Sequence, residues 1–117
     1  MATDGPGGPI FHLALVSDWE SALAAGDYRV STIGRSLAEE GFLHASYRHQ
    51  VDGVRARFYA GVTQPLLLLE IDPSLLDVPL VVETPDGADE AFPHIYGPLP
   101  IGAVLSVSPV DPSVPFR

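Results

Sequence analysis

Leu66-Leu67-Leu68-Leu69-Glu70-Ile71 is the stretch that decides the fold of this 117-residue sequence. Together with Pro65 it contains the longest apolar run of the chain, Pro65–Leu69. A run of this length is typical of a buried strand, and it falls far short of the roughly 20 apolar residues that a membrane helix needs. We therefore expect a strand over residues 66–71 and no membrane-spanning segment.

The chain after this strand indicates further β structure. We expect strands at Leu80–Glu83 and Ala103–Val110, a single helical turn at Pro73–Leu76, and a turn at Pro85-Asp86-Gly87, whose residues are typical of turns. Three prolines fall within Ala91–Pro100. Because proline cannot donate a ladder hydrogen bond, this segment is predicted to be an irregular, aromatic-rich loop and not a central strand.

The first half of the chain carries the helix signals. We expect a strand over Pro9–Leu15, followed by a helix. Ser17 and Glu20 have the spacing of a capping box at the start of this helix, in which the serine caps and the glutamate reaches back. Gly26 offers a left-handed stop at its end.

Two more helices and one more strand are predicted before residue 60. A short helix covers Ser36–Glu40, and Phe42–Ser46 alternates like a strand. A longer helix is expected over Gln50–Tyr59, where the apolar residues recur at helical spacing. Its buried face is predicted to be formed by Val51, Val54 and Phe58.

This order of elements, with helices early and strands late, predicts the α+β class. The length favours one domain, which we place at residues 9–110. A flexible lead-in at residues 1–8 and an extended tail at residues 111–117 are expected to flank it.

The charge of the chain is unevenly distributed. The formal net charge is −9, there is no lysine, and residues 58–116 contain eight acids and no base. Such a chain repels the phosphates of duplex nucleic acid, so we expect no duplex binding. The arginines between residues 29 and 57 are either solvated surface residues or a means of holding a small anion, because the guanidinium fork matches a phosphate.

Several classes of protein are disfavoured by what the sequence lacks. The N-terminus has neither the basic nor the apolar region of a signal peptide, and there is no cysteine, so we expect a cytoplasmic protein without disulfides. Thiolate ligands and a helical zinc motif are both missing, and no metal site is predicted. The sequence also lacks the glycine-rich and serine motifs of P-loop enzymes, Rossmann dehydrogenases and α/β-hydrolases.

Histidines mark the candidate site. Alternation along the strand at residues 42–46 places His44 and Ser46 on one face, where an imidazole and a hydroxyl can jointly hold a polar ligand. His94 and Tyr96 lie in the proline-restrained segment, and rigid loops often carry function. His12 lies in the first strand. We expect these three histidines and Ser46 to converge on one cleft.

Each of these residues also has a purely structural interpretation. A lone strand histidine such as His12 is more often a hydrogen-bonded core residue. Tyr96 is more often a packing residue with a satisfied hydroxyl, and Ser46 is placed to cap the following helix.

Several segments together resemble the DUF952 family of small bacterial proteins, over roughly residues 9–110. The most specific are Gly41-Phe42-Leu43-His44-Ala45-Ser46 and Phe92-Pro93-His94-Ile95-Tyr96-Gly97-Pro98. The others are Ile10-Phe11-His12, Trp19 with Ala22 and Gly26, Gln50, Phe58-Tyr59 and Glu83.

The fold of this family resembles that of the ADP-ribosyltransferase group, which implies a bent β core with two or three short helices in the N-terminal half. By this resemblance His12 and Ser46 would hold the ribose of NAD, and Glu83, His94 and His44 are the catalytic candidates. Glu83 and His94 compete for the principal catalytic place. The remaining ligand-binding candidates are Tyr96, stacking on a flat ring, and Arg57 and Arg35, taking phosphate.

Three functions follow as hypotheses. The first is an enzyme of ADP-ribosyltransferase-like fold that uses NAD or a related nucleotide as substrate and holds no covalently bound cofactor. The second is a nucleotide or small-ligand binding module without the chemistry. The third is an acidic domain that binds a protein partner.

Overall fold

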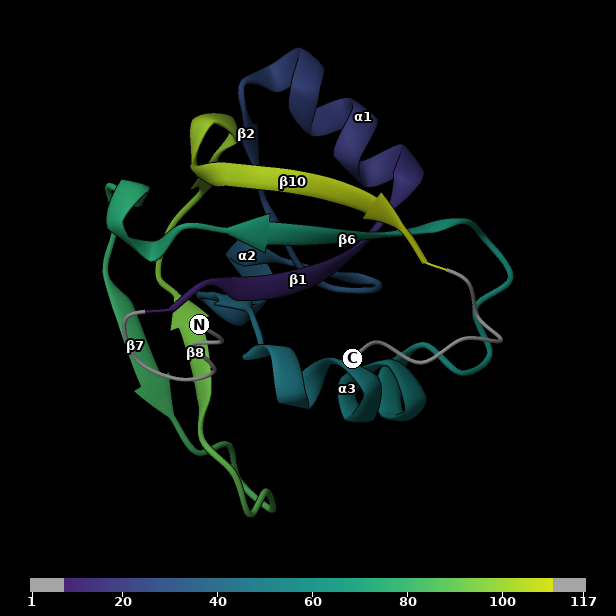
Figure 1. Ribbon diagram of the computed structural model, residues 1–117, viewed down its shortest axis with the longest axis vertical. Helices are drawn as coiled ribbons and strands as arrows, with labels where there is room; N and C mark the ends of the chain where they lie inside the picture. Colours follow the sequence, from purple (N-terminus) through teal and green to yellow (C-terminus); the bar gives the residue numbers. More distant parts are fainter. Residues whose placement is uncertain (1–7, 111–117) are drawn as a thin grey trace.

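Small antiparallel sheets dominate the fold in the computed structural model, which describes residues 8–110 (Figure 1). Among the described residues, two sheets have three strands each, in the spatial orders β1-β6-β10 and β5-β8-β7. Two further sheets have two strands each, β2-β9 and β3-β4. The strands are β1 (Ile10–Leu15), β2 (Asp27–Tyr28), β3 (Val30–Thr32), β4 (Arg35–Ser36), β5 (Leu43–His44), β6 (Leu66–Ile71), β7 (Leu80–Glu83), β8 (Phe92–Ile95), β9 (Leu99–Pro100) and β10 (Val104–Pro109).

The helices are few and short, and the α-helices all precede β6. They are α1 (Val16–Ala25), α2 (Leu37–Glu40) and α3 (Val51–Phe58), with 3₁₀ turns η1 (Arg48–Gln50), η2 (Pro73–Leu75) and η3 (Ile101–Ala103). The fold therefore mixes a few helices with several small antiparallel sheets. The predicted order of helices early and strands late holds only in part, because β1 to β5 alternate with the helices in the first half of the chain. Within the described residues, no helix is long and apolar enough to span a membrane.

The strand β6 forms the centre of the first sheet, between β1 and β10. Figure 1 shows α1 above this sheet and α3 below it. Leu69 of β6 is 0% exposed. A strand covered on both sides needs apolar residues at consecutive positions instead of alternate ones, which is why residues 66–69 form an unbroken apolar run. The predicted bounds of this strand are confirmed.

The neighbouring strand β1 divides its side chains between two core clusters. Ile10 and Ala14 join the cluster that contains Trp19 of α1. Phe11 and Leu13 join the cluster formed with α3. One strand therefore ties both cores together, and its position agrees with the prediction.

Helix α1 begins differently from the prediction. It starts at Val16, its N-cap is Leu15, and no side chain caps it, so the capping box expected at Ser17 and Glu20 is wrong. The helix starts as soon as β1 ends, which leaves Ser17 inside the first turn. Gly26 does end the helix in a left-handed conformation, with φ 97°.

A capping box does form at α2. The Ser36 hydroxyl accepts the Glu39 N–H at 3.2 Å, and the Glu39 carboxylate accepts the Ser36 N–H at 2.8 Å. The short helix expected at residues 36–40 is therefore confirmed, with Ser36 as its cap.

Helix α3 buries a face that differs by one residue from the predicted one. Val51 and Val54 are buried as expected, whereas Phe58 is 48% exposed and Tyr59 is buried in its place. The helix ends at Phe58 and is preceded by η1. Because the backbone leaves the helical path after Phe58, the next aromatic ring turns inward. Placing Phe58 in the core was wrong.

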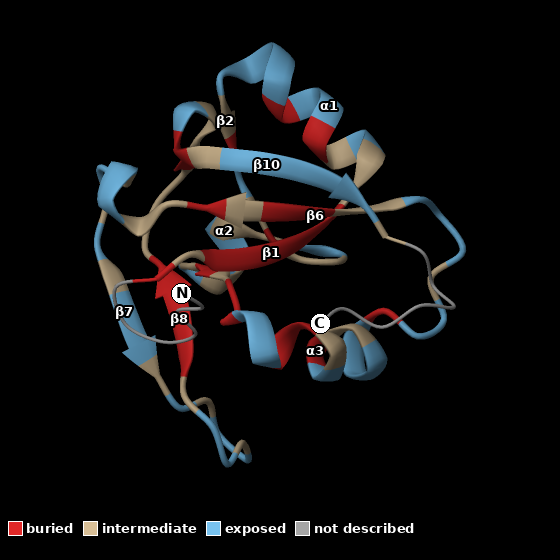
Figure 2. Ribbon diagram, viewed as in Figure 1, coloured by how far each residue is buried: buried red, intermediate tan, exposed pale blue. Residues whose placement is uncertain are grey.

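The strand β8 contradicts the prediction of an irregular loop. Phe92–Ile95 is the central strand of the β5-β8-β7 sheet, and Figure 2 shows it buried along its length. The Pro93 carbonyl accepts the Ala45 N–H at 3.0 Å. Within one strand residue the nitrogen and the carbonyl face the same neighbour, so the missing N–H of Pro93 faces Ala45, one residue beyond the end of β5. The proline is tolerated because that ladder has already ended.

Other elements agree with their predictions at slightly different bounds. The strand at 80–83 and the turns at 73–75 and 85–88 are present, and the last strand begins at Val104. The short strands β2, β3 and β4 were not predicted, because two or three residues carry no readable period. Apart from Gly8, the expected lead-in and the expected tail lie outside the described residues.

Candidate functional site

One face of the β5-β8-β7 sheet carries most of the candidate residues. His44 of β5 and His94 of β8 lie directly opposite each other in the ladder, with their ring centroids 5.5 Å apart. Phe42 stacks on the His94 ring at 4.0 Å and an interplanar angle of 16°. The opposite face of this sheet sends Leu43 and Ile95 into the core. The alternation predicted for residues 42–46 is therefore confirmed for His44, which lies on the face opposite Leu43 and Ala45.

An open cleft of about 190 Å³ lies beside this face. Helix α3 forms one wall, the β7–β8 loop forms the other, and His44 and Phe92 contribute from the sheet. The lining residues are His44, Gln50, Gly53, Val54, Arg57, Phe58, Pro85, Asp86, Gly87, Ala88, Glu90 and Phe92.

His44 is the titratable ring between the walls of the cleft. Its ring lies 5.1 Å from Phe92 and 6.3 Å from Phe58, measured between centroids. Burial, with smaller contributions from His12 and His94, lowers the pKa of His44 to about 4. The ring is therefore neutral at pH 7, and its buried Nε2 has no hydrogen-bond partner among the described residues. A neutral imidazole of this kind can accept or donate a hydrogen bond to a ligand.

A second, much smaller cavity lies behind His44. Its volume of about 10 Å³ corresponds to roughly one water molecule. It is lined by Phe11, His12, Leu13, His44, Ser46, Val51, Val54, Tyr59 and Leu68. His12, His44 and Ser46 thus meet around one cavity, although this space is too small for a ligand.

His12 is fully occupied by protein partners. Its Nδ1 lies 2.6 Å from the His44 carbonyl, which can only accept, so Nδ1 carries the proton and donates. Its Nε2 then accepts from the Tyr28 hydroxyl at 2.9 Å. Burial lowers the pKa of His12 to about 4, which keeps the ring neutral. Both nitrogens are used within the fold, and the carbonyl bond holds the backbone of His44.

His94 belongs to a separate polar group with Glu83 and Tyr96. Its Nδ1 donates to the Glu83 carboxylate at 2.7 Å, and the Tyr96 hydroxyl donates to the same oxygen at 2.6 Å. These hydrogen bonds, that of Tyr96 first, lower the pKa of Glu83, and the same contact raises the pKa of Tyr96. His94 is 3% exposed, and its Nε2 has no partner among the described residues.

The two candidate arginines are in different places. Arg57 lines the cleft from α3. Arg35 is paired with Glu40 next to α2 and lines none of the described cavities that His44 reaches. The sequence alone gave no reason to place Arg57, and not Arg35, at the cleft.

The structure therefore brings together some of the predicted residues and separates others. His12, His44 and Ser46 share the small cavity, and His94 adjoins His44 across the ladder. Glu83 and Tyr96 contact His94 without lining the cleft.

The sequence missed the second wall of the cleft. Residues 85–88 were expected only as a turn, and the exposed Phe58 was assigned to the core. The aspartate and glycine of that turn gave no chemical signal of their own. Within residues 8–110, no three metal-ligating side chains are grouped in a way that would hold a metal ion.

Fold and cleft together define a small protein of mixed helices and antiparallel sheets, with an open cleft beside a pair of cross-strand histidines. The chain belongs to the family described as "Protein of unknown function (DUF952)", whose model matches residues 13–107. No protein in the comparison with curated proteins matches it.

Solved structures of one bacterial protein share this fold. The crystal structure of protein CC0527 from Caulobacter crescentus has a TM-score of 0.75 and 27% sequence identity, covering 88% of this chain and 86% of that chain. A crystal structure of a double mutant of CC0527 gives the same TM-score at 26% identity, with the same coverage. The solution NMR structure of CC0527 gives a TM-score of 0.71 at 27% identity, covering 88% and 84%.

Proposed function

We propose that the protein binds a nucleotide, NAD or a related molecule, in the cleft above His44. The observation that carries this proposal is the neutral imidazole of His44, which has a buried nitrogen without a partner in the described part of the chain and lies near the aromatic rings of Phe58 and Phe92. A flat heterocycle can pack against such rings while its polar edge reaches the imidazole.

The other lining residues suit the remaining parts of a nucleotide. Arg57 at the cleft offers two parallel N–H donors to a phosphate. Asp86 on the facing wall offers a carboxylate acceptor for ribose hydroxyls. The volume of about 190 Å³ is below the roughly 300–1,000 Å³ of a site that encloses a drug-sized ligand. We therefore expect the cleft to take one base and its ribose, with the rest of a dinucleotide outside.

Calorimetric titration with AMP, ADP-ribose and NAD tests this proposal. We expect binding by the wild type, and a loss of affinity of roughly tenfold or more in Arg57→Ala, because a charged hydrogen bond contributes about 1.5–3 kcal/mol. Arg35→Ala is the matched control and should bind like the wild type. Failure of all three ligands to bind would contradict the proposal and favour a protein-interaction domain.

A second candidate function is transfer of ADP-ribose from NAD, which the resemblance to the ADP-ribosyltransferase group suggests. The observation that favours it is the Glu83 carboxylate, whose pKa is lowered by Tyr96 and His94. An ionised carboxylate of this kind can stabilise the positive charge that develops on the ribose as nicotinamide leaves. Glu83 does not line the cleft, and for this reason binding is the better-supported function.

Release of nicotinamide from NAD separates the two candidates. Turnover by the wild type that is lost in Glu83→Gln would favour the transferase. Binding of NAD without release of nicotinamide would favour the binding module.

A further inference from the structure

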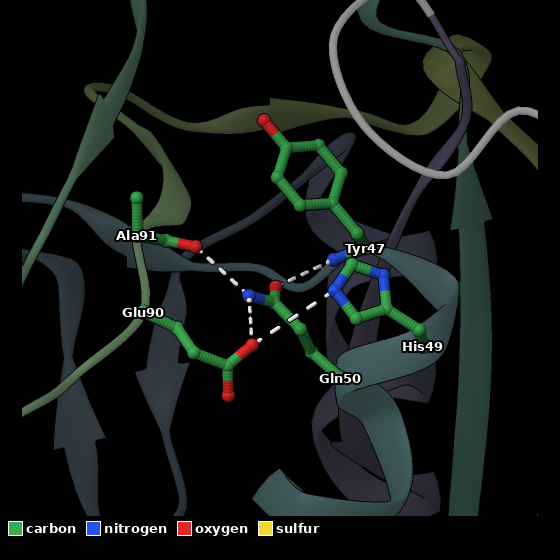
Figure 3. A network of polar contacts seen from close by, with 5 residues as sticks. All are labelled: Tyr47, His49, Gln50, Glu90 and Ala91. Atoms are coloured by element: carbon green, nitrogen blue, oxygen red, sulfur yellow. Dashed lines mark hydrogen bonds and ion pairs between the residues drawn. The ribbon is translucent and has the colours of Figure 1, made fainter.

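Gln50 is a buried side chain that none of the roles above uses. It is 5% exposed and stands at the junction of η1 and α3. Figure 3 shows its amide between the start of the helix and the chain leading into β8. The amide oxygen accepts the Tyr47 N–H at 3.0 Å, and the amide nitrogen donates to the Ala91 carbonyl at 2.8 Å and to the Glu90 carboxylate at 3.1 Å.

Two of these hydrogen bonds, to Glu90 and Ala91, connect the two walls of the cleft, and the third holds the amide against the start of η1. Tyr47 precedes η1 and α3, whereas Glu90 and Ala91 end the loop that contains Pro85–Ala88. Gln50 and Glu90 themselves line the cleft. Gln50 therefore bridges the two walls at one end of the cleft.

Glutamine fits this position because both ends of its side chain are used. The acceptor takes a backbone N–H, and the two N–H groups take a carbonyl and a carboxylate. A glutamate at position 50 would keep the acceptor, lose both donors and set a second carboxylate against Glu90. A leucine would leave the Tyr47 N–H and the Ala91 carbonyl without this partner.

The Glu90 carboxylate gives the contact a second consequence. Gln50 and His49 both approach the same oxygen, the imidazole at 3.8 Å. Held in this way, the carboxylate is kept at the η1 side of the cleft. If it were released, the carboxylate could move toward Asp86, and the two negative charges together would repel an anionic ligand.

We propose that Gln50 is a positioning residue that latches residues 84–91 onto the start of α3, fixing the width of the cleft and the place of its acidic wall. The effect on ligand affinity rests on the proposed function, whereas the latch itself does not.

Amide hydrogen exchange of the ligand-free protein tests the latch. In Gln50→Glu and Gln50→Leu, residues 84–91 should exchange faster than in the wild type by about tenfold or more, because local opening follows the loss of these bonds. The strand β6 should keep its protection, which shows that the fold is intact. Gln64→Glu makes the same chemical change at an exposed position and should leave the loop as in the wild type. Unchanged exchange of residues 84–91 in both Gln50 variants would overturn the latch.

Two further variants keep the test valid if a Gln50 substitution prevents folding. Glu90→Ala removes one bond of the latch from an exposed side chain and should speed exchange of the loop by a smaller factor. In the exchanged pair Gln50→Glu with Glu90→Gln, an amide again faces a carboxylate, and part of the protection should return. The latch would be contradicted if residues 84–91 exchanged at the wild-type rate in Glu90→Ala, or if the exchanged pair regained none of the lost protection.

Titration with ADP-ribose tests the consequence for the site. Gln50→Glu should weaken binding by about tenfold or more, and Gln64→Glu should not. If the wild type binds no nucleotide, the proposed function fails while the exchange experiment still decides on the latch. If Gln50→Glu frees the loop yet binds ADP-ribose like the wild type, the latch stands and its control of the cleft is overturned.

Discussion

The two three-stranded sheets differ in what their buried residues do. In β1-β6-β10, the buried polar side chain His12 has partners at both ring nitrogens, and the central strand is wholly apolar apart from Glu70. In β5-β8-β7, the central strand contains a proline, and His44 and His94 each keep a buried nitrogen without a partner among the described residues. Unsatisfied buried groups cost stability. The comparison teaches that the first sheet satisfies its buried polar side chain within the fold, whereas the second keeps unpartnered buried nitrogens, and one of its histidines, His44, lines the cleft.

The largest expected effect concerns the β1-β6-β10 sheet. Leu69→Ala should lower the free energy of unfolding by about 2–5 kcal/mol, because it removes a fully buried side chain and leaves a cavity. Leu105 of β10 is 55% exposed, and Leu105→Ala is the control, expected within about 0.5 kcal/mol of the wild type. Urea denaturation measures both. Equal effects of the two substitutions would break the assignment of β6 as the centre of the core.

The next effect is a dependence of stability on pH that both sheets share. The pKa values of His12 and His44 are lowered to about 4 from 6.5, so the unfolded chain binds protons that the folded protein does not. The free energy of unfolding therefore keeps its full value above pH 6.5. It decreases as the pH falls toward 4, by roughly 3 kcal/mol for each histidine.

Urea denaturation between pH 4.5 and 7.5 measures this dependence. The slope of the unfolding free energy against pH reflects the number of protons taken up on unfolding. His12→Gln and His44→Gln should each reduce this slope by the amount that one histidine contributes. A wild type with constant stability over this range would contradict the burial of both imidazoles.

A smaller effect distinguishes residues that stabilise the β5-β8-β7 sheet from residues that contact the ligand. His94→Ala should cost about 1–3 kcal/mol, because it removes a buried ring stacked on Phe42 and hydrogen-bonded to Glu83. Affinity for ADP-ribose should be retained, since His94 does not line the cleft. Phe58→Ala should do the reverse, with stability within about 0.5 kcal/mol and weakened binding. A stable His94→Ala that no longer binds ADP-ribose would make His94 a ligand contact instead.

The smallest effect is a change in one pKa. Tyr96→Phe removes the hydrogen bond that contributes most to the lowered pKa of Glu83. The pKa of Glu83 should therefore rise toward its ordinary value, which an NMR titration of the side-chain carboxyl can follow. A pKa unchanged by the substitution would mean that His94 alone holds the carboxylate.

The same comparison explains which parts of the fold could be predicted from the sequence. A strand buried on both faces, such as Leu66–Ile71, is marked by an apolar run, here residues 66–69, and was predicted with its full bounds. The strand β8 was missed because Pro93 is a strong signal against a central strand, and only the short length of β5 makes it acceptable. That length depends on tertiary contacts that no local pattern reports.

The candidate site could be predicted in part for a related reason. Alternation correctly oriented His44 and Ser46, because a strand's period is local. Alternation could not show that Arg57, and not Arg35, lines the cleft. It also could not predict the wall at Pro85–Ala88, because the approach of a loop to a helix is set by long-range contacts such as that of Gln50.

Mapping of ADP-ribose binding by NMR tests the central claim most directly. In a titration followed by backbone amide shifts, we expect the changes to gather in three segments that border the cleft: His44, residues 50–58 and residues 85–92. The strands β6 and β10 should show little change. Shifts centred on the β1-β6-β10 sheet, or no shifts at all, would contradict the assignment of the cleft above His44 as the ligand site.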